Sequence, residues 1–232
     1  MTNHQLGAPI QIIANLMGLP QCLVYISQNK MTTGDKMFQV RIHGRGGQGV
    51  VTGAEMLSIA AFLEGRHAQA FPSFGSERTG APVVAFCRLD DREIRLREPI
   101  MQPDALIIQD PTLLHQVDVL SGLKRPDGYI LINTNKSFAQ LGLADFVKDM
   151  RADRLLALPA TELSLKHVGR PVPNVPLLGG FAAASGLISL ASVVAAIKDK
   201  FSGKVADGNI AAATEAYNLV KDATNAKEAS HA

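Results

Sequence analysis

The stretch that decides the fold is FQVRIHGRGGQGV, which occupies residues 38–50. Its first part, Phe38–His43, predicts a short strand that stops at Gly44. From Val50 to Leu63, apolar residues recur at helical spacing and predict a helix. Between the strand and the helix, the six residues Gly44, Arg45, Gly46, Gly47, Gln48 and Gly49 match the pattern G-x-G-x-x-G. The order therefore predicts a strand, a glycine-rich turn and a helix.

The chemistry of this glycine turn favours a negatively charged ligand. Glycines permit positive φ and let the backbone approach a phosphate closely. A helix that begins near Val50 offers free N–H groups and the positive end of its dipole, and Arg45 adds a cation at the same place. Two interpretations stand side by side: a site for a phosphate or another anion, or a tight strand-to-helix crossover that binds nothing.

The residues after the turn do not complete a nucleotide site. An NAD site needs an acidic residue at the end of the second strand, where it binds the ribose hydroxyls. That strand is predicted over His67–Phe71 and ends at Pro72 without a carboxylate, whereas Glu64 precedes it. No Gly-Lys-Ser/Thr sequence follows the glycines, so a P-loop is excluded as well.

A second polar loop, FPSFGSERTGAP at residues 71–82, leaves the second predicted strand. In a doubly wound sheet, ligands bind beyond the carboxyl ends of the strands, so we expect this loop beside the glycine turn. Ser76, Arg78 and Thr79 are able to donate hydrogen bonds to a phosphate, a carboxylate or the backbone of a partner. The alternative is an ordinary surface loop.

The rest of the chain alternates predicted strands and helices. Residues 82–89 and 93–96 predict a hairpin, and the charges of residues 88–98 cancel, as at a solvated edge. A proline-rich loop, residues 169–176, precedes two closing helices. The other predicted strands are Asp104–Gln109, Tyr129–Ile132 and Leu155–Leu158, and the predicted helices are Pro111–Leu120, Leu177–Lys200 and Asn209–Ala223. This alternation predicts an open, mostly parallel, Rossmann-like α/β sheet with helices on both faces.

The N-terminal residues 1–36 differ in composition from the rest and precede the first strand. We interpret them as an N-terminal extension of one domain over residues 37–232, with Met31 and Met37 as alternative starts. They lack the basic and apolar regions of a signal peptide. The most apolar run, Leu177–Ile197, is rich in glycine, serine and alanine, as a packed helix is. We therefore expect a cytoplasmic protein without a membrane span.

The composition excludes several classes of site. The 232 residues include 23 Lys and Arg against 21 Asp and Glu, a net charge of +2, which gives no broad basic field for nucleic acid. Two cysteines, Cys22 and Cys87, are too few for the four that ligate an iron–sulfur cluster. The six histidines show no metal-binding spacing, and no Gly-x-Ser-x-Gly elbow is present. We therefore expect a binding edge with no catalytic residue, metal or cofactor of its own.

The sequence also contains four longer motifs: VRIHGRGGQGVV (40–51), PSFGSERTGAPV (72–83), QDPTLL (109–114) and PNVPLLGG (173–180). In this order they resemble the γ subunit of pyruvate:ferredoxin oxidoreductase and of related 2-oxoacid:acceptor oxidoreductases. The resemblance extends from about Phe38 to Val220. One departure is Thr79, where many members of that family have a second arginine or a glycine.

The resemblance implies a subunit that is not catalytic alone. Enzymes of this family cleave a 2-oxoacid with thiamine diphosphate and Mg, release CO2, pass two electrons through [4Fe-4S] clusters and usually form an acyl-CoA. By similarity, the cofactors and the path to ferredoxin or NAD belong to α-, β- and δ-type subunits. We expect pyruvate as the 2-oxoacid. The alternatives are an aromatic 2-oxoacid (phenylglyoxylate or indolepyruvate), or a stand-alone nucleotide-binding or NAD-dependent protein.

Within such a complex, the glycine turn is expected to line the path of coenzyme A or its phosphates. The residues expected to contribute are Gly44–Gly49, which include Arg45, together with Ser76 and Arg78. The alternative is that the same loops only hold the α and β subunits.

Overall fold

The computed structural model describes residues 37–73 and 79–229 of the chain. The predicted N-terminal extension, residues 1–36, lies outside the described residues, as do Ser76 and Arg78 of the predicted site. The other predicted site residues, Gly44–Gly49, are described. No described helix is both long enough and apolar enough to cross a bilayer.

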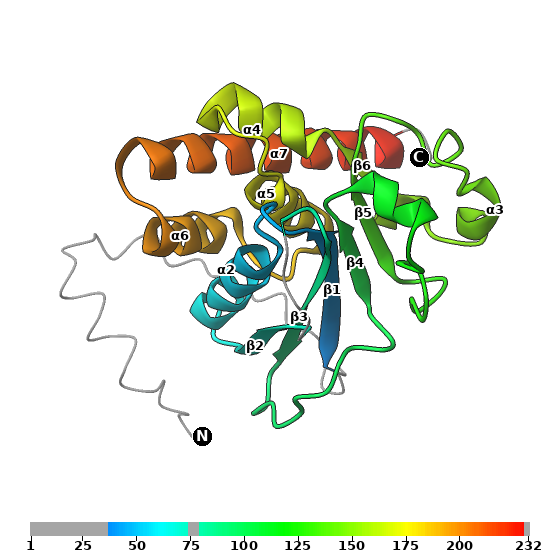
Figure 1. Cartoon of the computed structure of the whole chain (residues 1–232), viewed down its shortest axis with the longest axis horizontal. Coiled ribbons are helices and arrows are strands. Elements are labelled where there is room, and N and C mark those ends of the chain that lie inside the picture. Colours follow the sequence, from blue (N-terminus) through cyan, green and yellow to red (C-terminus); the bar gives the residue numbers. More distant parts are fainter. Residues whose placement is uncertain (1–36, 74–78, 230–232) are drawn as a thin grey trace, which may run out of the picture. The chain divides into compact units, whose positions relative to one another are not determined.

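A six-stranded sheet forms the centre of the described structure (Figure 1). Its strands are ordered β2-β3-β1-β4-β5-β6. The strands are β1 (Phe38–Arg45), β2 (His67–Pro72), β3 (Pro82–Asp90), β4 (Ala105–Ile108), β5 (Tyr129–Asn133) and β6 (Leu155–Leu158). β1, β4, β5 and β6 are parallel, whereas β3 pairs antiparallel with both β1 and β2. The predicted mostly parallel α/β sheet is confirmed, with an antiparallel part at one edge.

One face of the sheet is covered by the longer helices of the described structure (Figure 1). α2 packs on β2 and β3, α6 packs on α2, and α5 packs along α7. Side chains such as Ile42, Leu57 and Phe181 form the larger core between the sheet and these helices. The helices are α2 (Val50–Leu63), α4 (Ala160–Val168), α5 (Asn174–Ser185), α6 (Leu190–Lys200) and α7 (Gly203–Ala229).

The opposite face is covered mainly by irregular chain between β4 and β6. Leu106 and Ile130 point to this side and form a second core with Leu113 and Leu143. The 3-10 helix η1 (Pro111–His115) and the one-turn helix α3 (Ala144–Val147) contribute to it, while the 3-10 helix η2 (Ala152–Arg154) leads into β6. Helices therefore lie on both faces, but those of this face are short.

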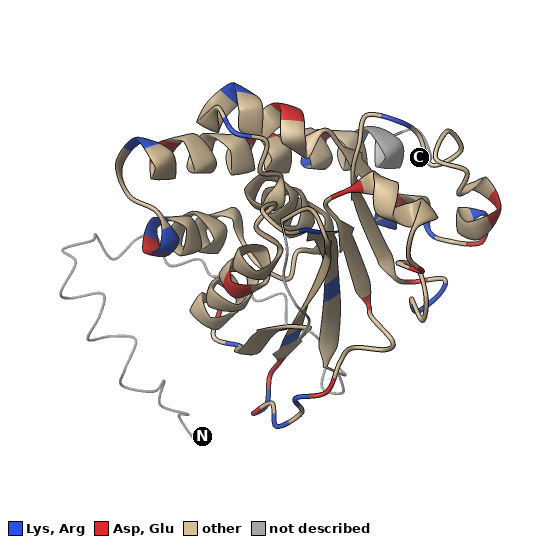
Figure 2. Cartoon of the chain, in the orientation of Figure 1, with Lys and Arg blue, Asp and Glu red and all other residues tan. Residues whose placement is uncertain are grey.

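The predicted hairpin over residues 82–96 is wrong. β3 ends at Asp90 and residues 93–96 form no strand, because β3 finds its partners in β1 and β2 instead. The loop after β3 mixes acidic and basic residues (Figure 2). We expected Arg88 to lie at a solvated edge, but the structure buries it. Its Nη2 donates to the Glu98 carbonyl at 2.6 Å.

Several predicted helices have different bounds in the structure. Only η1 forms where a helix over Pro111–Leu120 is predicted. The single helix predicted over 177–200 is two helices, because Gly186 adopts a left-handed conformation and ends α5. α5 begins at Asn174, inside the predicted proline-rich loop, since Pro176 falls in the first turn, where a missing N–H costs no hydrogen bond. α4 has no counterpart in the prediction, and α7 is longer than predicted at both ends.

Candidate functional site at the glycine turn

The glycine turn follows the first of two neighbouring strands, β1 and β4, whose following connections cross opposite faces of the sheet. After β1 the chain enters α2 in the larger core, whereas after β4 it enters η1 over the opposite face. β1 and β4 are parallel neighbours, so the loops at their carboxyl ends diverge to the two sides of the sheet. Open α/β sheets bind ligands where loops diverge in this way.

The turn is bonded to the described end of the second polar loop. β1 extends to Arg45, two residues beyond the prediction, because it pairs with the start of β3. Gly46 forms an isolated bridge with Thr79. The Gly46 N–H donates to the Ala81 carbonyl at 3.0 Å, and the Gly80 N–H donates to the Gly46 carbonyl at 3.1 Å. The described end of this loop therefore lies beside the turn, as predicted from the sheet topology.

Gly49 ends the turn as the N-cap residue of α2. Its φ of 72° is left-handed, and a Cβ there would collide with the amide nitrogen of Asn174, which donates to the Gly49 carbonyl at 3.2 Å. Within the described chain, no side chain caps α2, and no acceptor bonds to the N–H groups of Val50, Val51 or Thr52. The helix start therefore keeps unpaired donors and the positive end of its dipole.

The guanidinium of Arg45 is bonded to protein groups through all three of its nitrogens. Nε donates to Asp110 at 2.9 Å, Nη1 donates to the Gly80 carbonyl at 3.1 Å, and Nη2 donates to Thr112 and Gln116, both at 2.8 Å. The side chain thus joins β1 to η1 and to the loop before β3. The predicted cation therefore lies at the turn with its charge paired to Asp110, and Arg45 ties the surrounding loops together.

Asp110 is the acidic centre of this network. Its Oδ1 accepts from the Thr112 N–H at 3.0 Å and from the Thr112 hydroxyl at 2.6 Å, while Oδ2 accepts from Gln48 at 3.1 Å. Burial alone would raise the pKa of Asp110, but these hydrogen bonds and the one from Arg45 outweigh it and hold the pKa below its ordinary value. Gln48 also accepts from the Arg45 N–H at 2.8 Å. An ionised Asp110 therefore fixes the shape of the turn.

Two buried polar residues beside the turn, Gln109 and Asn174, lie in the longer motifs but are not among the predicted site residues. Gln109 follows β4, is 1% exposed, and its Oε1 bonds to no described residue. That oxygen faces Gly44, where a Cβ would lie 3.0 Å from it. A polar residue directly after a buried apolar strand is the signal that points to Gln109. For Asn174, the motif at 173–180 does not reveal the contact with Gly49, because that contact joins positions 125 residues apart.

Glu64, the acid nearest to the position that an NAD site requires, serves another purpose. It caps the carboxyl end of α2, away from the turn, and accepts from the Ser189 N–H at 2.9 Å at the start of α6. Burial raises the pKa of Glu64, but hydrogen bonds from Ser189 and Ser192 outweigh that effect, so the pKa lies below its ordinary value. The residue joins two helices.

The described residues do not fit a metal ion or an iron–sulfur cluster. They contain no group of three or more His, Cys, Asp and Glu side chains that could hold a metal ion. Cys87 is free and lies in the larger core, where burial raises the pKa of its thiol. A protonated thiol enclosed by apolar side chains is a poor ligand.

Comparison with known protein families and sequences gives a consistent match. The family model described as pyruvate ferredoxin/flavodoxin oxidoreductase matches residues 39–219. The chain is 47% identical over 182 residues to the pyruvate/ketoisovalerate oxidoreductases common subunit gamma of Pyrococcus abyssi. It is also 47% identical over 182 residues to the pyruvate synthase subunit PorC of Methanocaldococcus jannaschii. Each match covers 78% of this chain and 96% of the relative.

Solved structures show the same fold. The pyruvate oxidoreductase subunit PORC of Thermotoga maritima is 33% identical, with a TM-score of 0.67, over 79% of this chain and 97% of that one. A 2-oxoglutarate:ferredoxin oxidoreductase from Magnetococcus marinus, solved with 2-oxoglutarate, coenzyme A and succinyl-CoA bound, is 18% identical with a TM-score of 0.60. That match covers 83% of this chain and 32% of the larger one, and it bears on the fold alone.

Proposed function

The chain belongs to the pyruvate ferredoxin/flavodoxin oxidoreductase family as a gamma subunit, and from this we propose that its complex oxidatively decarboxylates pyruvate and that its glycine turn lines the path of coenzyme A. Two relatives matched over 96% of their length support pyruvate as the substrate, since both names include pyruvate, although one of them also includes ketoisovalerate. They give no support to an aromatic 2-oxoacid, nor to a stand-alone nucleotide-binding or NAD-dependent protein.

In this proposal, the redox cofactors belong to other chains of a cytoplasmic complex. Thiamine diphosphate with Mg and the [4Fe-4S] clusters are assigned to α-, β- and δ-type subunits, through which electrons reach the acceptor. The cysteine count supports this division, because the two cysteines of the chain, Cys22 and Cys87, are fewer than the four that usually ligate one cluster. The gamma subunit then contributes binding and positioning, and coenzyme A is a substrate that passes along it.

The observation that supports the coenzyme A path is the start of α2. Its first N–H groups bond to no described acceptor, and they lie where the loops after β1 and β4 diverge. Phosphates bind such helix starts through backbone donors and the helix dipole. Because the Arg45 charge is paired with Asp110, we assign Arg45 a positioning role, in which it holds the turn that presents those donors.

The test is the substitution Arg45→Ala in the intact complex. It removes the hydrogen bonds to Asp110, Gly80, Thr112 and Gln116, so the turn loses its fixed geometry. We expect the KM for coenzyme A to rise about tenfold, which corresponds to about 1.4 kcal/mol, and the KM for pyruvate to change little. Arg45→Lys keeps the charge but lacks the planar fork, so its effect should be intermediate.

Arg95→Ala is the matched control, because Arg95 is exposed and, within the described part of the chain, its side chain bonds only to Glu93, two residues away. The control should leave both KM values unchanged. An unchanged dependence on coenzyme A for Arg45→Ala, in a complex with all subunits present, would contradict the proposed ligand path. Loss of subunits from the Arg45→Ala complex without a change in KM would support the alternative, in which the loops only hold partners.

A further inference from the structure

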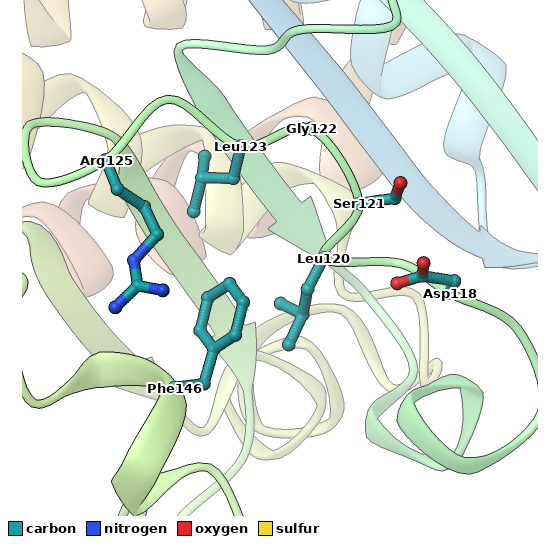
Figure 3. A pocket seen from close by; sticks show the side chains of 7 residues that line it. All are labelled: Asp118, Leu120, Ser121, Gly122, Leu123, Arg125 and Phe146. Atoms are coloured by element: carbon teal, nitrogen blue, oxygen red, sulfur yellow. The ribbon is translucent and has the colours of Figure 1, made fainter.

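A cavity of about 340 Å³ lies between the segment before β5 and the helix α3, which carries Phe146 (Figure 3). Residues 118–125, which precede β5, line most of it. The Lys124 N–H donates to the Pro103 carbonyl just before β4, which places this segment at the amino ends of β4 and β5. The glycine turn follows the carboxyl end of β1, which is parallel to β4. The cavity is therefore separate from the candidate coenzyme A path.

The cavity combines apolar side chains with a positioned arginine. Leu120, Leu123 and Phe146 point into the same space, with Arg125 on one side of them and Asp118 on the other (Figure 3). The guanidinium carbon of Arg125 lies 4.9 Å from the centre of the Phe146 ring. At this distance the ring attracts the cation and restricts its orientation.

The guanidinium N–H groups of Arg125 form no hydrogen bond with the described residues. The ion pair of Arg125 with Asp149 spans 3.7 Å, with the Asp149 side chain 72% exposed. An exposed pair at that distance contributes little, because water and salt screen it. The planar fork of a guanidinium matches the two oxygens of a carboxylate. The guanidinium of Arg125 is therefore available to bind a carboxylate of another molecule.

Buried Arg41 holds the wall of the cavity in shape. Its Nη2 donates to the carbonyls of Val119 and Ser121 at 3.0 and 2.6 Å, and its Nη1 donates to the Ile100 carbonyl at 3.3 Å. Burial lowers the pKa of Arg41, whereas the charge of Asp118 acts in the opposite direction. The negative charge of Asp118 is therefore partly balanced by buried Arg41, whereas Arg125 has only the exposed Asp149 at 3.7 Å.

The size and chemistry of the cavity define what it accepts. About 340 Å³ is near the lower end of the range for small-molecule sites, about 300–1,000 Å³, so the cavity suits one large side chain better than a cofactor. The chain is a gamma subunit, so its surface meets other subunits. We propose that this cavity docks a segment of another subunit of the complex, one that places a large apolar side chain next to a carboxylate.

In this arrangement, the apolar side chain lies on Leu120, Leu123 and Phe146, and the carboxylate accepts two hydrogen bonds from Arg125. The proposal rests on membership of the family as a subunit. It does not depend on the coenzyme A path, since the two sites lie at opposite ends of the parallel strands.

Photo-crosslinking in the assembled complex tests the identity of the occupant. The substitution Phe146→p-benzoylphenylalanine keeps an aromatic ring at the cavity, and mass spectrometry identifies the peptide that it captures. We expect one segment of another subunit, with a large apolar residue adjacent to Asp, Glu or a terminal carboxylate. Capture of no other subunit, or of a segment without a carboxylate, would overturn the proposal.

Charge reversal at Arg125 tests the role of the guanidinium. Arg125→Glu should raise the dissociation constant of the chain for the rest of the complex at least about tenfold, as for an arginine at the centre of an interface, and Arg125→Lys should have a smaller effect. The control is Arg151→Glu, because Arg151 is half exposed and bonded to Asp153 outside the cavity. Circular dichroism and the melting temperature establish that each variant is folded.

The control should change the dissociation constant less than about twofold. An Arg125→Glu variant that is folded and assembles as tightly as the wild type would overturn the proposal. Equal weakening by Arg125→Glu and Arg151→Glu would do so too, because it would show a general effect of charge and not a docking contact.

Discussion

A single guanidinium, that of Arg45, connects three segments around the glycine turn. It reaches Asp110 after β4, Thr112 in η1 and the Gly80 carbonyl before β3. The side chains of the Arg45–Asp110 pair are 21% and 15% exposed, so water screens the pair less than a surface pair. Removal of one partner leaves the other charge partly buried without compensation, which is the costly outcome for such pairs.

His43, on β1 just before the turn, makes stability depend on pH. Burial, assisted by the positive charge of Arg41, lowers the pKa of His43 to about 3 from an ordinary value of 6.5. Between these pH values the unfolded chain binds a proton that the folded chain does not. The free energy of unfolding should therefore fall as the pH drops below about 6.5, with His43 contributing up to about 1.4 kcal/mol per pH unit.

Urea unfolding of His43→Leu and the wild type at several pH values between about 4 and 7 measures this contribution. The variant should show a shallower pH dependence, because it has no group to protonate at this position. The control is His67→Gln, since His67 is exposed at the start of β2 and its replacement should leave the dependence unchanged. Identical pH dependence for His43→Leu and the wild type would contradict the assignment.

At the scale of elements, the close packing of α5 on α7 depends on small residues. A Cβ at Gly179 would collide with the Ala213 carbonyl of α7, and Ala212, Ala213 and Ala216 are fully buried along that contact. A backbone carbonyl within a helix cannot move aside as a side chain does. The two helices therefore approach each other only because this position has no side chain.

Gly179→Ala should destabilise the protein although alanine favours helices. The intrinsic helix preference gains about 1 kcal/mol, whereas overpacking costs about 1–3 kcal/mol, and the collision with backbone favours the upper end. We expect a net loss of about 2 kcal/mol in the free energy of unfolding, measured by urea. Gly180→Ala is the control, because its nearest neighbour is the end of the flexible Leu158 side chain at 2.9 Å, and it should lose less than half as much.

At the scale of the whole molecule, the two proposed sites lie at opposite ends of the parallel strands. The carboxyl ends hold the glycine turn, with unpaired N–H groups and a paired arginine. The amino ends hold the cavity with the available Arg125. The described residues between them form two apolar cores without a metal-ligand group. This organisation suits the proposed role of a subunit that binds and positions other parts of the complex.

The isolated chain should therefore assemble no iron–sulfur cluster. With two cysteines in 232 residues, it cannot supply the four thiolates that such a cluster usually needs. After incubation with iron and sulfide under reducing conditions and removal of excess reagent, visible absorption and iron analysis should show no bound cluster. Stoichiometric iron with a cluster spectrum would contradict this, as would oxidation of pyruvate by the chain alone.

Local sequence signals were enough for much of the fold. The bounds of α2 and β6 agree with the predictions, because helical periodicity and a short apolar run ended by Pro159 act over a few residues. The hairpin over residues 82–96 was wrong because the partners of β3 are chosen by tertiary contacts with β1 and β2. The division into α5 and α6 at Gly186 was missed, since alanine-rich sequence on both sides obscures the left-handed residue.

For the candidate site, too, some features follow from the sequence and others from the tertiary structure alone. The sequence by itself determined the position of the glycine turn, the shortage of cysteine and the family, since these depend on residue types and short spacings. Only the tertiary structure decided that Arg45 is paired, that Gln109 and Asn174 flank the turn, and that Arg125 faces a cavity. The Arg45–Asp110 and Asn174–Gly49 contacts join residues 65 and 125 positions apart, and such distant partners are selected by packing of the whole chain.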